Sequence, residues 1–71
     1  MKKLQTRINR VKGQLEGINR MIENGEDSSK IAMQISAAVS GMQSIKTTYM
    51  KVRMMEEIME NMSTILENIK D

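Results

Sequence analysis

The chain has 71 residues, a formal net charge of +2 at pH 7, and no Cys, His, Pro, Trp or Phe. These absences exclude zinc fingers, thiolate metal sites, imidazole acid–base catalysis and thiol nucleophiles, so they exclude most enzyme classes. A single domain of residues 1–71 is marginal as a monomer, and without disulfides or a structural metal the composition predicts a non-enzymatic protein that oligomerises.

The first predicted element is a helix over residues 2 to 24. Its apolar residues alternate between spacings of four and three, which is typical of one narrow helical seam. The seam consists of Leu4, Ile8, Val11, Leu15, Ile18 and Ile22. Asn24-Gly25 predicts the end of this helix, because glycine adopts the left-handed conformation that closes many helices.

Positive charge is concentrated on this first helix. Residues 1–24 carry six bases and two acids, whereas residues 25–71 carry five bases and seven acids. At 100° per residue, four polar residues form a stripe roughly 60° wide beside the seam. We call Lys3, Arg7, Arg10 and Gln14 the basic stripe. We expect it to contact DNA phosphates, with Lys46 of the second helix extending it. A solvated helix start would account for the same residues without a partner.

The second predicted element is a helix over residues 29 to 57. Asp27, Ser28 or Ser29 is expected to cap it, and the short connection predicts an antiparallel hairpin. Its seam consists of Ile31, Ile35, Ala38, Met42, Ile45, Tyr49 and Val52. Further apolar residues lie off this seam, so a second copy is expected to cover them.

The last predicted element is a short helix over residues 63 to 70, after a break at Asn61-Met62-Ser63-Thr64, where capping residues precede Ile65, Leu66 and Ile69. The predicted fold is therefore all-α, with a three-helix protomer that forms a homodimer and a tetramer. No apolar run is long enough to span a membrane, so we expect a cytoplasmic protein without a membrane partner.

Nine methionines leave a thioether Cu(I) site open as an alternative, since soft sulfur ligands suit Cu(I). The methionines stand at spacings typical of helix interfaces, where flexible thioethers fill gaps, and we favour this packing role. No cofactor is expected.

Two sequence blocks carry a family resemblance. Residues 7–23 read RINRVKGQLEGINRMIE, and residues 34–38 read QISAA at the expected distance downstream. The chain resembles the copper-sensitive operon repressors of the CsoR/RcnR/FrmR family. The resemblance implies an antiparallel four-helix bundle dimer, a dimer-of-dimers tetramer, and a bacterial repressor that releases operator DNA on sensing a metal ion, formaldehyde or persulfide.

The sensing positions depart from that family. The resemblance places its two sensing Cys residues at Ser28 and Glu57, and its copper-ligating His at Arg53. We therefore predict a duplex-DNA-binding repressor without a metal site. Arg53 and Glu57 are expected to pair with each other; the sharper alternative is that Arg53 binds an anionic small-molecule inducer. A helical oligomerisation module that has lost operator binding remains the alternative function.

Overall fold

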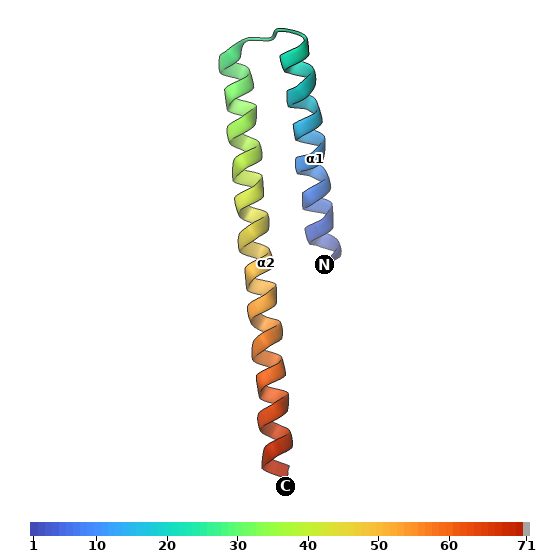
Figure 1. Cartoon of the computed structure of the whole chain (residues 1–71), viewed down its shortest axis with the longest axis vertical. Helices are drawn as coiled ribbons and strands as arrows, with labels where there is room; N and C mark the ends of the chain where they lie inside the picture. The colour runs from blue at the N-terminus through green and yellow to red at the C-terminus, as the bar shows by residue number, and fades with distance from the viewer. Residues whose placement is uncertain (71) are drawn as a thin grey trace.

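The protein folds as one long hairpin of two helices (Figure 1). The computed structural model describes residues 1–70, and side chains as far as residue 69. Helix α1 covers Lys2–Glu23 and helix α2 covers Ser28–Lys70. The all-α class and the hairpin are confirmed, and each predicted helix start or end at the turn lies within one residue of the observed one.

The turn after α1 ends the helix with two backbone hydrogen bonds from the turn to carbonyls of the last helical turn. The backbone N–H of Gly25 donates to the carbonyl of Ile22 at 3.1 Å, and that of Glu26 donates to the carbonyl of Met21 at 3.0 Å. This is the Schellman pattern, which needs a left-handed residue after the helix. Gly25 has a φ of 65° and supplies that conformation, so the predicted role of Asn24-Gly25 is confirmed.

Asp27 caps the start of α2. Its carbonyl accepts the backbone N–H groups of Lys30 and Ile31, both at 3.1 Å. Its side-chain Oδ2 accepts the hydroxyl of Ser29 at 2.6 Å. The first backbone bond of α2 therefore runs to Asp27, and the helix begins directly afterwards at Ser28.

One row of apolar residues from each helix is buried in the hairpin. These rows consist of Leu4, Val11 and Ile18 in α1 and of Ala38 and Ile45 in α2. The neighbouring row of each predicted seam is not covered, and its side chains are between 45% and 56% exposed. We call these the open rows: Ile8, Leu15 and Ile22 in α1, and Ile35, Met42 and Tyr49 in α2. Each predicted seam therefore has one row in the hairpin core and one row outside it.

The predicted break before residue 63 is wrong, because α2 continues unbroken to Lys70. The Thr64 hydroxyl donates to the carbonyl of Glu60 at 3.1 Å, one turn earlier in the same helix. A polar side chain that bonds in this way is satisfied inside a helix and need not cap a new one. The chain also has no glycine after Gly41 and no proline, so nothing in this segment interrupts the helix.

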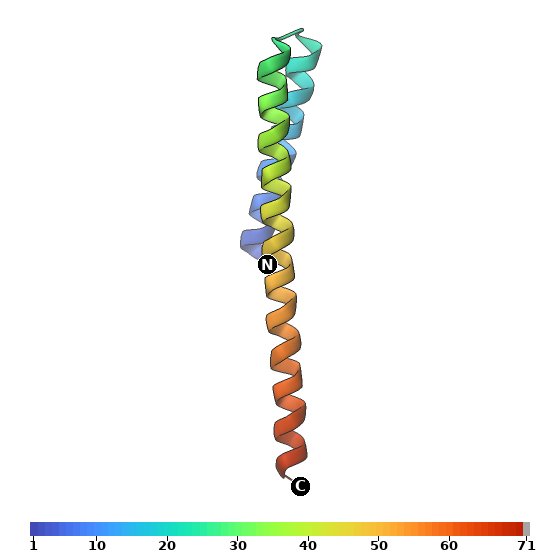
Figure 2. The same cartoon turned by 90° about the vertical axis from the view of Figure 1, so that its left-hand side faces the viewer.

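The second part of α2 projects beyond α1. Both views show the N-terminus beside the middle of α2, with the rest of α2 continuing alone (Figures 1 and 2). We call residues 53–70 the α2 extension. Its large apolar side chains are between 56% and 72% exposed: Met54, Met55, Ile58, Met59, Met62, Ile65, Leu66 and Ile69. The molecule is accordingly elongated, with extents of 69 × 18 × 12 Å.

Across the described residues, neither helix has a segment both long and apolar enough to cross a membrane.

Candidate nucleic-acid interface

The hairpin has a polar side and an apolar side. On the polar side, Arg7, Arg10 and Gln14 of α1 and Gly41 and Ser44 of α2 line a hollow of about 300 Å³. Lys3, Arg7 and Arg10 line a second hollow of about 180 Å³ together with Thr6. The structure therefore brings all four residues of the basic stripe together around two adjoining hollows that share Arg7 and Arg10.

The cations of the basic stripe are not neutralised by the chain itself. Among the described residues, no acidic side chain lines either hollow, and no ion pair includes Lys3, Arg7 or Arg10. All three residues are exposed. An exposed group of unpaired cations creates a positive potential that attracts a polyanion such as nucleic acid.

Arg7 is held across the hairpin by α2. Its Nη1 donates to the Thr48 hydroxyl at 3.0 Å, which is the one side-chain hydrogen bond between α1 and α2 in the part of the chain described. Thr48 is half-buried, whereas Arg7 is exposed. The charge pattern of the sequence did not indicate Thr48. The available signal was its position three residues after Ile45 of the buried row, which places it at the border of the helix contact.

The helices approach closely beside this bond, because α2 has a glycine at the contact. An ideal Cβ at Gly41 would lie 3.1 Å from Cγ2 of Val11 and 3.9 Å from the side-chain oxygen of Gln14. A side chain at position 41 would therefore push against Val11 of the buried row, while its contact with Gln14 of the basic stripe would be ordinary.

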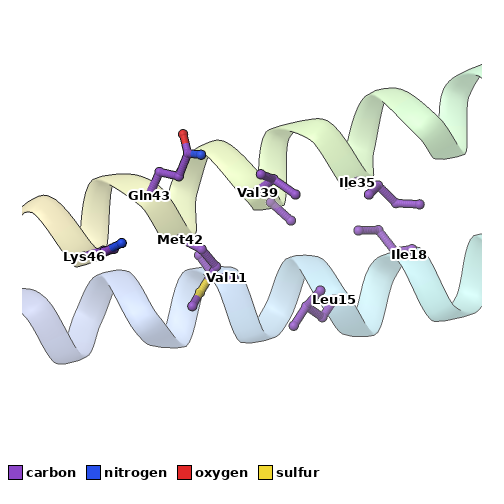
Figure 3. A pocket seen from close by; sticks show the side chains of 9 residues that line it. Val11, Leu15, Ile18, Ile35, Val39, Met42, Gln43 and Lys46 are labelled. Atoms are coloured by element: carbon purple, nitrogen blue, oxygen red, sulfur yellow. The ribbon is translucent and has the colours of Figure 1, made fainter.

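Lys46 does not join the basic stripe in the hairpin. It lies at one end of an apolar groove of about 410 Å³ on the other side (Figure 3). The remaining lining is mostly apolar and comes from both helices: Val11, Leu15, Ile18, Ile35, Ala38, Val39, Met42 and Gln43. The groove includes Leu15, Ile35 and Met42 of the open rows, so it marks the apolar side of the hairpin.

The three sensing positions are far apart along one protomer. Ser28 begins α2, and Arg53 lies 25 positions later, which corresponds to roughly 37 Å of helix. At 100° per residue, Ser28, Arg53 and Glu57 lie within roughly 40° of one another, on the side of α2 that carries Met42. They therefore share the face of α2 that carries Met42, although Arg53 and Glu57 lie in the α2 extension, beyond α1.

Arg53 pairs with Glu56 and not with Glu57. Its Nη1 lies 2.7 Å from Oε2 of Glu56, and both side chains are about half exposed. The expected pair with Glu57 is therefore wrong. Helix geometry permits Arg53 to pair with a residue three or four positions away, and here it pairs with Glu56, three positions away.

These residues do not fit a transition-metal site. A guanidinium offers only donors and no lone pair, so Arg53 is no ligand, and Ser28 and Glu57 leave one hydroxyl and one carboxylate. No group of three or more acidic side chains in the described residues is arranged to hold a metal ion. The chain has no Cys or His to supply other ligands.

Comparison with known protein families places the chain beside transcriptional repressors. The model of a family described as metal-sensitive transcriptional repressor matches residues 1–71. Searches of curated proteins and of solved structures gave no match. The family match confirms the resemblance that the blocks at residues 7–23 and 34–38 indicated.

Proposed function

The chain belongs to the metal-sensitive DNA-binding transcriptional repressors, which are not enzymes, and from this we propose that it binds duplex operator DNA through the basic stripe, as a homo-oligomer. Other members of the family bind operator DNA as oligomers. In this chain, the basic stripe is proposed to bind the DNA, and no metal ion is proposed to regulate the binding.

The observation that carries the proposal is the group of unpaired cations around the two hollows of the polar side. Arg7 and Arg10 belong to both hollows, and Lys3 and Gln14 extend the group along α1. Arginine guanidinium groups bind phosphate oxygens through several donors at once. Only 1% of the residues are aromatic, so base stacking on single strands is disfavoured and duplex phosphates are the better target.

Incomplete burial of the hairpin supports the oligomer. The protomer exposes 6245 Å², whereas a compact monomer of its mass would expose about 4,500 Å². Its radius of gyration is 19.7 Å, compared with about 11 Å for a compact domain of this length. We propose that the open rows and the apolar groove pack against the same surface of a second copy, which gives an antiparallel four-helix bundle.

A second apolar surface supports a dimer of dimers. The exposed side chains of the α2 extension centre on Met55 and Met62, roughly 160° around the helix axis from Met42 of the open row. One two-fold contact through the open rows therefore leaves this surface uncovered. We propose that it forms a second contact between dimers, so the repressor is a tetramer.

Lys46 is proposed to contact DNA only in the assembled oligomer. It lies at the end of the groove that a second copy would cover, and one hairpin cannot present it together with Arg7. We propose that a duplex lying across the assembled repressor reaches Lys46 at the edge of the bundle. Lys46→Ala should therefore weaken binding less than Arg7→Ala.

The proposed repressor does not sense a transition metal. In place of metal ligands, its sensing positions carry a hydroxyl, a guanidinium and a carboxylate beside the proposed dimer contact. An anionic small molecule that displaced Glu56 from Arg53 could act as an inducer there. If such a molecule releases DNA equally well after Arg53→Ala, then Arg53 is not the inducer site.

The experiment that tests the function is selection of bound duplexes from a random DNA pool by the full chain. We expect a set of related, pseudo-palindromic duplexes, because a two-fold assembly repeats its contacts on two half-sites. Recovery of no duplex from a correctly assembled oligomer would contradict the proposal and support the oligomerisation module.

A further inference from the structure

We propose that Thr48 is a positioning residue for DNA binding, because it fixes the guanidinium of Arg7 for contact with a backbone phosphate. This inference rests on the proposed function, since it concerns the same polar surface. It adds a residue of α2 to a contact surface that the charge pattern placed on α1.

The geometry leaves Arg7 free to bind a phosphate while Thr48 holds it. One bond, from Nη1 to the Thr48 hydroxyl, uses a single donor of a guanidinium that has five. Arg7 also lines both hollows of the polar side, so its remaining donors lie where the proposed duplex would run.

Thr48 is suited to hold another side chain in place. A β-branched residue in a helix has few allowed rotamers, so its hydroxyl has a restricted position. The helix contact between Gly41 and Val11 keeps α1 and α2 close enough for the bond. Gly41 lies about two turns before Thr48 in α2, and Val11 lies about one turn after Arg7 in α1. The position of Arg7 therefore depends on the spacing of the two helices.

The expected benefit is a smaller loss of freedom on binding. A long arginine side chain loses rotamer freedom when it is fixed on a phosphate, and a side chain already fixed in the free protein loses less. Loss of the Thr48 hydroxyl should weaken DNA binding without changing the charge of the surface.

The test compares variants of the full chain by fluorescence anisotropy with a labelled duplex of about 30 base pairs at low salt. Thr48→Val removes the hydroxyl and keeps the branched shape, and it should weaken binding about three- to tenfold. Thr48→Ser restores a hydroxyl and should bind within about twofold of the wild type. Thr64→Val is the matched control, because it also removes a hydroxyl that donates one hydrogen bond, to the Glu60 carbonyl, but lies far from the basic stripe and should bind normally.

Three comparisons separate positioning from a purely structural role. In an Arg7→Ala background, Thr48→Val should have no further effect on binding. The salt dependence of Thr48→Val should match the wild type, because the number of neutralised phosphates is unchanged, whereas Arg7→Ala should lower the slope. Melting and sedimentation of Thr48→Val should match those of the wild type, while a structural role would change them.

Each outcome decides the inference. Unchanged binding by Thr48→Val, or an equal loss in the Arg7→Ala background, overturns the role of Thr48 and leaves the proposed function standing. If the wild-type oligomer binds no duplex at low salt, the proposed function and this inference are both wrong.

Discussion

An ideal Cβ at Gly41 would lie 3.1 Å from Cγ2 of Val11, so the hairpin places a glycine against a buried branched side chain. This separation is shorter than ordinary carbon–carbon contact, and a side chain at position 41 requires the neighbour to move. Val11 is only 5% exposed and has little room to do so.

The contact predicts opposite effects at two helical glycines. Gly13 has no neighbour within 4 Å of an ideal Cβ, so Gly13→Ala should stabilise the protein by about 0.5–1 kcal/mol through helix propensity alone. Gly41→Leu should destabilise it by about 1–3 kcal/mol, because the core beside Val11 becomes overpacked. Urea unfolding followed by circular dichroism measures both changes. A Gly41→Leu variant as stable as the wild type would contradict the described helix contact.

The continuity of α2 predicts the effect of a substitution at Ser63. In a continuous helix, Ser63→Ala should stabilise the protein by a few tenths of a kcal/mol, because alanine has the higher helix propensity. If a new helix instead began at residue 63 with Ser63 as its cap, the same change would cost about 1 kcal/mol. Thermal unfolding distinguishes the two signs, and a clear destabilisation would contradict the unbroken helix.

The open rows predict the effect of a charge on oligomerisation. Met42→Glu places a carboxylate in the apolar groove of the proposed dimer contact and should break that contact, so that the tetramer dissociates into smaller species at micromolar concentration. Met33→Glu is the matched control, because Met33 is 72% exposed and lies outside the open rows. Analytical ultracentrifugation checks both variants. A folded wild-type monomer, or an intact Met42→Glu oligomer, would contradict the proposed contact.

The donor chemistry of the sensing positions predicts no tight transition-metal binding. Calorimetry with Cu(I) under anaerobic conditions should give no stoichiometric, high-affinity isotherm. A stoichiometric isotherm would contradict this prediction and direct attention to the thioethers. Met50 and Met54 would then be tested first by substitution with leucine, because they line one hollow together.

The hairpin could be predicted from the sequence because its signals are local. The seam spacings and the Asn24-Gly25 turn each depend on residues a few positions apart. The spacing did not reveal which row of a seam is buried, since Ile8 and Val11 fit the same helical pattern and only the placement of α2 separates them.

Other features depend on contacts that sequence spacing does not determine. The bond from Arg7 to Thr48 joins residues 41 positions apart, so no local pattern indicates it. The predicted break failed because Thr64 carries a capping side chain that bonds inside the helix instead. Arg53 can reach either Glu56 or Glu57 from the same helix, and its rotamer determines that it pairs with Glu56.

The most direct test of the proposed repressor is the salt dependence of duplex binding by the double variant Arg7→Ala/Arg10→Ala. The control is Arg20→Ala, which removes an arginine from the same helix. Arg20 lies in the last turn of α1, outside the basic stripe. The wild type and Arg20→Ala should bind a selected duplex with a similar, steep loss of affinity as salt rises. The double variant should assemble normally in sedimentation and lose binding. Unchanged affinity and an unchanged salt slope in the double variant would contradict the assignment of DNA binding to the basic stripe.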